Sequence, residues 1–284
     1  MEHVRIEDRP ELARPALVCA FRGWNDGGEA ATSAATYLKD RWEARRFASI
    51  DPEEFFDFQV TRPTVSLVDG VTRQIDWPRN DFFHASPGGR DVVVFLGIEP
   101  NMRWRTFIEA ILGLSSDLGV ESLVTLGAFL ADVPHTVATP LAGSAANPEE
   151  ASSLGMSASR YEGPTGIVGV VHDAALRAGL HSLSLWAAVP HYLPGGPNPK
   201  AALALAEKAA AVLGAPIETD TLARAGANWE KQVNQTIAEN PELLAYVRRL
   251  EELAGEREIT EIPTGESLAA ELERFLREQR GDQG

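Results

Sequence analysis

Residues 15–40 read PALVCAFRGWNDGGEAATSAATYLKD, and this stretch decides the fold class. Its first part, 15–21, is an apolar run with Val and Phe after a proline, which is typical of a buried strand. Its last part has small apolar residues at helical spacing, namely Ala30, Ala31, Ala34, Ala35 and Leu38. Because a strand leads directly into a helix, we expect an α/β unit to begin here.

The alternation of strand and helix patterns continues along the chain. The run VVVFLGIEP at 92–100 is uniformly apolar, as expected for a central parallel strand with helices on both faces. Helical spacing follows at 104–118, and a glycine-rich turn at 163–169 precedes another helix. Further strands are predicted at 44–50, 121–130 and 182–190, and as a hairpin around Asp69 and Gly70. The pattern predicts a three-layer α/β/α sandwich with a mostly parallel sheet.

Only helical patterns follow Pro199. Three amphipathic stretches predict a C-terminal helical extension, at 222–237, 243–253 and 268–276. We therefore divide the chain into an α/β sheet domain, 1–217, and a helical extension, 218–284. The extension carries 15 acidic and 8 basic residues, so it is the more acidic part of the chain. Two interpretations stay open, a solvated helical face and a docking surface for a basic partner.

The composition narrows the functional classes. A formal net charge of -15 over 284 residues disfavours nucleic acid and anionic membranes as partners. Cys19 is the single cysteine and cannot form an internal disulfide, which fits a reducing cytoplasm. The first residues hold no apolar signal core, and no apolar run reaches about 18 residues. We expect a soluble, cytoplasmic protein.

Common catalytic motifs are missing from the sequence. It holds no GxxxxGK[ST] loop, no GxGxxG turn after a strand and no GxSxG elbow. The six histidines show no metal-ligand spacing. The few lysines lie on predicted helices, which disfavours an ATP-dependent ligase because that chemistry needs a lysine at the phosphates. We therefore predict no cofactor and no metal site, and we assign no catalytic residue.

The turn GWNDGGEA at 23–30 raises the question of a phosphate site. Asp26 stands before the predicted helix and Glu29 follows three residues later, as in a capping box. Both carboxylates face the positive end of the helix, so we expect the turn to cap itself rather than to hold phosphate. The alternative is that Trp24, Asn25 and Asp26 form a polar pocket wall, since ligands of open sheets bind at strand ends.

A second glycine-rich turn, GPTGIVGV at 163–170, is a better candidate for an anion. Gly163, Thr165 and Gly166 would leave backbone amides exposed at a helix start. The alternative is that the glycines only allow the helix to pack closely on the sheet.

The remaining candidates follow predicted strands, and they are Glu99, Arg103, Trp104, His135, His191 and Tyr192. Glu99 could act as a base and Arg103 could bind an anion, with a simple Glu–Arg ion pair as the alternative. The motifs VPHT and VPHY place His135 and His191 after two strands, where both could border one crevice. An ordinary role as hydrogen-bonded loop residues is the alternative for these histidines.

Several ordered stretches resemble the proteasome assembly chaperone 2 family, particularly its actinobacterial branch. They cover nearly the whole chain and read FRGWNDGGEAA, LGIEPNMRW, GAFLADVPHT, YEGPTGIVGVVHDA, SLWAAVPHYLPGGPNPKA and GESLAAELERFLREQ. The resemblance implies a three-layer α/β fold similar to nucleoside phosphorylases, a C-terminal helical extension and homo-oligomeric assembly, for example as a trimer. For eukaryotic members it implies a non-enzymatic chaperone that helps proteasome α subunits assemble.

Two functional hypotheses follow. The first is a non-enzymatic assembly chaperone or protein-interaction module that contacts copies of itself and proteasome α-type subunits. The printed sequence ends RGDQG and not in the hydrophobic–Tyr–any tail of several proteasome-binding factors, so we expect a surface such as the acidic helices to make the contact. The second is a nucleoside- or phosphate-type binding protein or enzyme that uses the crevice at the strand C-terminal ends. The missing motifs and the acidic extension favour the first.

Overall fold

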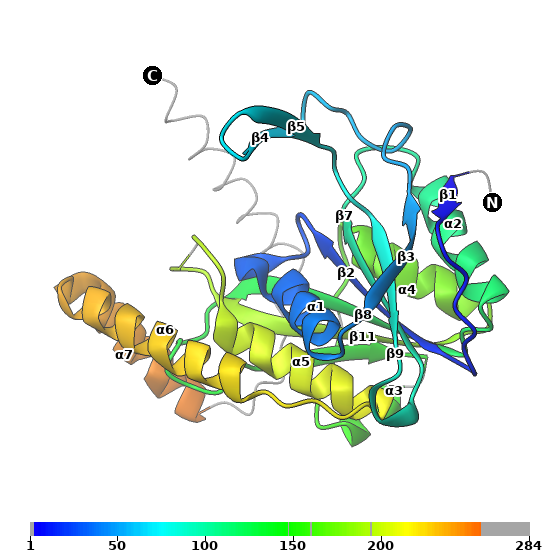
Figure 1. Cartoon of the computed structure of the whole chain (residues 1–284). Helices are drawn as coiled ribbons and strands as arrows, with labels where there is room; N and C mark the ends of the chain where they lie inside the picture. Colours follow the sequence, from blue (N-terminus) through cyan, green and yellow to red (C-terminus); the bar gives the residue numbers. More distant parts are fainter. Residues whose placement is uncertain (1–2, 147, 160, 194, 257–284) are drawn as a thin grey trace.

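The computed structural model describes residues 3–256 apart from 147, 160 and 194. Figure 1 shows one large sheet with helices packed against both of its faces. The strands are β1 (Val4–Ile6), β2 (Ala16–Arg22), β3 (Arg45–Ile50), β4 (Thr64–Val68), β5 (Thr72–Asp76), β6 (Asp81–Ala85), β7 (Val92–Ile98), β8 (Ser122–Ala131), β9 (Leu141–Ala145), β10 (Ser157–Ala158) and β11 (His181–Pro190). The helices are α1 (Ala30–Arg41), α2 (Trp104–Asp117), α3 (Pro148–Ser153), α4 (Ile167–Arg177), α5 (Pro199–Leu213), α6 (Asp220–Ala238) and α7 (Pro241–Glu256), with short 3-10 turns η1 (Gly27–Glu29) and η2 (Pro87–Gly89).

The centre of the sheet is parallel, as predicted. The nine strands have the order β1-β3-β6-β7-β2-β8-β11-β9-β10, and β7, β2, β8 and β11 run in the same direction. Ala16 of β2 lies opposite Val92 of β7 on one side and Ser122 of β8 on the other. The flanking strands β6 and β9 are antiparallel to their inner neighbours and were not predicted. Both are only five residues long, and their polar residues interrupt the apolar pattern.

The two faces of β2 create the two helical layers. Val18 and its even-numbered neighbours pack with the alanine-rich helices α1 and α5. Leu17, Cys19 and Phe21 face the other way, into a core with α2 and α4. Because consecutive side chains of a strand point to opposite faces, this single strand needs a cover on each side. The predicted α/β/α sandwich is confirmed.

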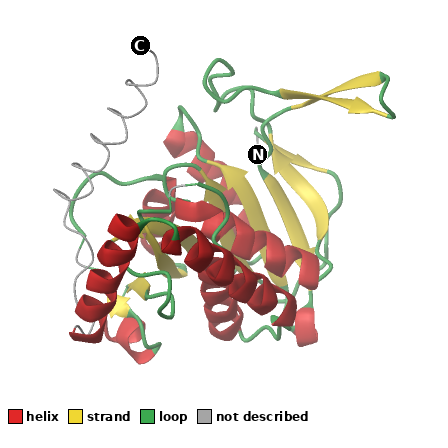
Figure 2. Ribbon diagram, turned by 90° about the vertical axis from the view of Figure 1, so that its left-hand side faces the viewer, coloured by secondary structure: helices red, strands yellow, loops and turns green. Residues whose placement is uncertain are grey.

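The predicted hairpin forms β4 and β5, but it stands apart from the main sheet as a separate two-stranded sheet. Asp69 and Gly70 have φ of 55° and 72°, and the amide of Val71 donates to the carbonyl of Val68 at 3.2 Å. This is the geometry of a type I′ turn, which explains the Asp-Gly pair. Figure 2 shows the hairpin projecting away from the sandwich.

Two helices, α6 and α7, extend beyond the sandwich, and we call them the helical arm (Figure 1). Gly226 allows α6 to approach α5, since a Cβ at this position would lie 3.5 Å from the Cα of Lys200. The predicted third helix around 268–276 lies outside the described residues, and the division between 217 and 218 stays a prediction. In the described part of the chain, no helix is long and apolar enough to cross a membrane.

We expect Leu17→Ala to lower the free energy of unfolding by about 2–5 kcal/mol, because it removes a buried side chain from the central strand. The matched substitution Leu67→Ala lies on the hairpin, where the side chain is 59% exposed, and should change stability by less than about 0.5 kcal/mol. Urea unfolding of both variants measures the difference. Equal losses would mean that the hairpin belongs to the cooperative core.

Candidate functional site

The carboxyl ends of β2, β7, β8 and β11 meet at one edge of the sheet, where ligands of open α/β sheets bind. The loops that follow these strands carry most of the predicted site residues. The structure brings some of these residues together in two groups, one around Glu99 and one around His135.

The first group is built around the carboxylate of Glu99. Its Oε1 accepts a hydrogen bond from the amide of Ile167 at 2.8 Å, and its Oε2 accepts one from the amide of Trp24 at 3.2 Å. Ile167 is the first residue of α4, so the carboxylate lies at the positive end of that helix. The predicted anion nest is therefore occupied by a carboxylate of the protein itself.

Arg103 belongs to a different contact. Its guanidinium forms an ion pair within the chain, but with Glu54 and not with Glu99. The indole Nε1 of neighbouring Trp104 donates to the carbonyl of Pro100 at 2.7 Å, which secures the turn before α2. Neither side chain joins Glu99 in a convergent set of polar groups.

Asn25 holds the same edge together from the side of β2. Its Oδ1 accepts from the amide of Val168 at 3.4 Å, and its carbonyl accepts from the amide of Ala128 in β8 at 2.8 Å. A Cβ at Gly166 would lie 2.0 Å from this Oδ1, and one at Gly23 would lie 2.9 Å from the Cβ of Glu99. Both glycines are therefore needed for close approach.

The other residues of the second glycine-rich turn lie just before α4. Gly163 has a φ of 158°, and the hydroxyl of Thr165 is 3.4 Å from the carbonyl of Gly166. These contacts are local to the turn and add no further group to the cluster around Glu99.

Asp26 caps α1, as expected. Its Oδ1 accepts from the amides of Ala31 at 2.8 Å and Thr32 at 3.1 Å, and its Oδ2 accepts from the Thr32 hydroxyl. Burial raises the pKa of Asp26, whereas the bonds from Thr32 and Ala31 act in the opposite direction. The reciprocal half of the predicted capping box is wrong, because the amide of Asp26 donates to the carbonyl of Gly23 and Glu29 adopts a φ of 48°.

The second group surrounds His135, which follows β8 and is only 3% exposed. The Tyr192 hydroxyl lies 2.8 Å from its Nδ1, and Asn234 Oδ1 of α6 lies 3.0 Å from its Nε2. This arrangement fits a neutral ring in which Nε2 carries the proton and Nδ1 accepts from the tyrosine. The Nζ of Lys200 donates to the carbonyl of His135 at 2.6 Å, and Trp229 of α6 packs against the ring edge-on.

His191 follows β11 and completes this group. Its Nδ1 lies 3.0 Å from Asp132 Oδ1, and its ring packs against Tyr246 of α7 with centroids 5.7 Å apart. Burial raises the pKa of Tyr192 to about 12, so the phenol stays neutral between the two histidines. Both histidine rings contact Tyr192, and side chains of the helical arm cover them. That the two histidines border one crevice stays a prediction. Nothing local in the sequence marks Asn234, Trp229 or Tyr246 as partners of the histidines, because they contact the histidines only after the arm has folded back.

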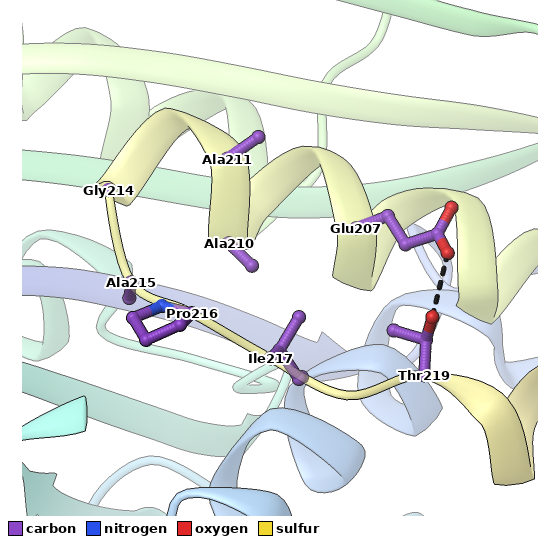
Figure 3. Close-up of a pocket in the computed structure, with 8 residues that line it drawn as sticks. All are labelled: Glu207, Ala210, Ala211, Gly214, Ala215, Pro216, Ile217 and Thr219. Atoms are coloured by element: carbon purple, nitrogen blue, oxygen red, sulfur yellow. Dashed lines mark hydrogen bonds between the residues drawn. The ribbon is translucent and has the colours of Figure 1, made fainter. Parts of the chain in front are cut away.

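The surface also has hollows. One of about 490 Å³ lies along α6, with Asn234 and Lys231 among its lining residues. Another of about 480 Å³ lies at the end of α5, where Glu207 accepts a hydrogen bond from Thr219 at 2.8 Å and small side chains such as Ala211 line the rest (Figure 3). A larger groove of about 720 Å³ lies beside the ends of β2 and β7 at the base of the hairpin, with Arg22 and Trp77 in its wall. The described residues that line these hollows include none of the predicted site residues.

Comparison with known proteins identifies the family. A model of the PAC2 family matches residues 20–237. The chain belongs to the PAC2 family. A PAC2 family protein from Streptomyces avermitilis is 43% identical with a TM-score of 0.76, and the match covers 82% of this chain and 99% of that one. A Mycobacterium tuberculosis proteasome-assembly chaperone homologue is 45% identical with a TM-score of 0.75 and the same coverage.

More distant solved structures share the fold. Pyrococcus furiosus PbaB, an archaeal proteasome activator, is 16% identical with a TM-score of 0.63, and the match covers 83% of this chain and 99% of that one. A comparison with curated proteins found no match. The resemblance to the PAC2 family and its actinobacterial members is thus confirmed.

We expect Glu99→Ala to lower the free energy of unfolding by about 1–2 kcal/mol, because the amides of Trp24 and Ile167 lose their acceptor. Glu99→Gln keeps one acceptor oxygen, so it should lower the free energy of unfolding by less than Glu99→Ala does. Urea unfolding measures both, with Glu109→Ala on the exposed side of α2 as the control for removing a surface carboxylate. Unchanged stability of Glu99→Ala would contradict the capping role.

Stability should also depend on pH through His135. Burial lowers the pKa of His135 in the folded protein, so below the unfolded value of about 6.5 the unfolded chain binds more protons. Stability should therefore fall as the pH falls from about 7 to about 5, by at most about 1.4 kcal/mol per pH unit for this group. His135→Gln should make the profile shallower in urea unfolding at several pH values. Parallel profiles for the two proteins would show that His135 does not contribute.

Proposed function

We propose that this PAC2 protein is a non-enzymatic assembly chaperone that binds α-type proteasome subunits. The observation that carries the proposal is the self-filled anion site, in which Glu99 accepts from the amides of Trp24 and Ile167. A nucleophile, base or anion clamp needs groups directed at a substrate. At this edge those groups are directed at one another.

The second group of polar residues supports the same conclusion. His135 donates and accepts within the protein, with Asn234 and Tyr192 as its partners. The contact of His135 with Asn234 holds α6 of the helical arm against the sheet edge. The Thr136 hydroxyl donates to Glu251 of α7 at 2.6 Å and holds the second helix of the arm. The edge where an enzyme would bind its substrate therefore serves to position two helices.

The helical arm offers the surface for a partner. Glu242 and Glu252 of α7 are exposed, as is Glu239 between α6 and α7, and all three belong to the more acidic part of the chain. Acidic side chains at the rim of a contact steer a basic partner and increase its association rate. Relatives point in the same direction, since one is named a proteasome-assembly chaperone homologue and a distant one an archaeal proteasome activator.

The alternative, a small-molecule ligand at the strand ends, stays a prediction. The groove beside β2 and β7 is the place for such a ligand, and Arg22 and Trp77 would contact it. We favour the chaperone because the residues predicted to act on a ligand, Glu99 and His135 foremost, are engaged elsewhere.

A pull-down of purified α-type proteasome subunits with the full-length protein tests the proposal. The wild type should retain the subunits, and Glu242→Lys with Glu252→Lys on α7 should retain several-fold less because the acidic surface is reversed. The control carries Glu109→Lys and Asp117→Lys, which make the same charge change on exposed positions of α2.

The outcomes distinguish the proposed partner from the proposed binding surface. Binding by the control but not by the α7 variant supports a docking surface on the arm. If the wild type retains no subunits, the proposed partner is wrong. If both variants retain the subunits equally, the proposed binding surface is wrong.

A further inference from the structure

The groove beside the ends of β2 and β7 lies between α1 and the base of the hairpin. Ser33 and Thr36 of α1 line one side of it, and Arg62 and Trp77 at the base of the hairpin line the other. A helix about 10 Å wide covers about two strands that lie about 4.8 Å apart. Because the hairpin forms a separate sheet away from the sandwich (Figure 2), the strip of sheet beside α1 stays open. The volume of the groove, about 720 Å³, lies within the range of about 300–1,000 Å³ that ligand sites have.

The floor of the groove is apolar. Phe83 of β6 and Leu96 of β7 belong to the face that packs with α1 and α5, and both are only partly buried. Ile98 at the end of β7 is also partly buried, and Trp77 is 49% exposed. The Trp77 ring packs against that of Phe58 with centroids 4.9 Å apart, which fixes its position. Since the aliphatic and phenyl side chains cannot hydrogen-bond to a nucleobase, the floor fits a purely apolar group better.

Two guanidiniums beside this floor have no acidic partner. Arg22 is the last residue of β2 and lies on the same face as Val18. Arg62 precedes the hairpin, where the hydroxyl of its neighbour Thr61 donates to Asn101 Oδ1 at 3.1 Å and holds the segment beside the end of β7. Both arginines are exposed, and neither side chain forms an ion pair or a hydrogen bond with any described residue. Both are therefore free to bind an anion.

The acidic side chains of the groove leave this positive charge in excess. Three of them are paired within the chain, namely Asp40 with Lys39 at 2.7 Å, Asp81 with Arg46 at 3.2 Å and Asp76 with Arg79 at 3.9 Å. Glu29 is the remaining acid, and it forms no ion pair with a described residue. Two unpaired guanidiniums and one unpaired carboxylate match a ligand with a single negative charge. A phosphate monoester carries about two charges, and one of them would stay uncompensated beside Glu29.

We propose that this groove binds a small organic acid that consists of one carboxylate and an apolar body. Arg22 and Arg62 bind the carboxylate through charge-assisted hydrogen bonds. The hydroxyls of Ser33 and Thr36 lie three residues apart on the wall formed by α1 and supply further donors. The apolar body lies on the floor and against the ring of Trp77.

This inference does not rest on the proposed chaperone function. The groove contains none of the side chains engaged around Glu99 and His135, and no residue of α7 lines it. A ligand in the groove therefore leaves the acidic surface of α7 open to a protein partner. Failure of the pull-down and failure of ligand binding are separate results, since they concern different surfaces.

Isothermal titration of the full-length protein with naphthoate tests the site. Naphthamide has the same apolar body without the charge, and acetate has the charge without the body. Naphthoate should bind at one site, at least about tenfold more tightly than either, because hydrogen bonds to charged groups and apolar burial act together. Trp77→Ala should weaken the binding of naphthoate and of naphthamide alike, since both lose the contact with the ring.

A pair of matched variants locates the carboxylate. Arg22→Gln with Arg62→Gln should weaken naphthoate binding at least about tenfold and leave naphthamide binding unchanged, which also shows that the variant is folded. The control, Arg5→Gln with Arg9→Gln, removes the same two charges from exposed positions near the N-terminus and should bind naphthoate like the wild type.

Four results would each overturn the proposal. The first is that naphthoate does not bind to the wild type. The second is that acetate binds as tightly as naphthoate, so that the apolar floor plays no part. The third is that naphthamide binds as tightly as naphthoate, so that the guanidiniums play no part. The fourth is an equal loss in the groove variant and the control, which would point to the overall charge of the protein and not to this groove.

Discussion

Burial of β2 on both faces is the constraint on which the rest of the structure depends. Its side chains alternate between two cores. Val18 is buried by the layer of α1 and α5, whereas Leu17 and Phe21 are buried by the layer of α2 and α4. Its backbone bonds to β7 and β8 on either side. The turn that follows, with Trp24, is therefore held at the middle of the carboxyl edge.

That position determines the chemistry of the edge. Turns and helix starts there expose backbone amides, which an α/β enzyme uses to bind an anionic ligand. In this protein Glu99, Asn25 and Asp26 supply the acceptors instead. Since a buried amide without an acceptor is costly, these side chains stabilise the fold, and an external anion would have to displace a carboxylate that is already bonded.

The two parts that project from the sandwich differ in how their apolar surface is used. The helical arm turns Trp229 and Tyr246 toward the loops after β8 and β11, where the histidines pack against them. The hairpin turns Val65 and Ile75 toward solvent. One projection is thus anchored within the chain, whereas the other leaves apolar side chains exposed to solvent.

The sequence by itself determined the layers, the central strands, the turn at Asp69 and Gly70, and the helices up to α7 except α3. Each of these follows from local physics: side-chain periodicity records which faces are buried, and two successive positive φ angles demand an Asp-Gly type of pair. Asp26 could be assigned as a cap for the same reason, because the groups that donate to its carboxylate lie within six residues.

Only the tertiary structure decided the partners of the other site residues. Glu99 bonds to an amide 68 residues away, Asn25 to one 143 residues away, and His135 to a side chain 99 residues away. Such bonds leave no periodic trace in the sequence, because the partner is chosen by the crossing of strands and helices. A carboxylate that could equally serve as a base, an ion-pair partner or a helix cap therefore acquires its role only when folding places two amides in front of it.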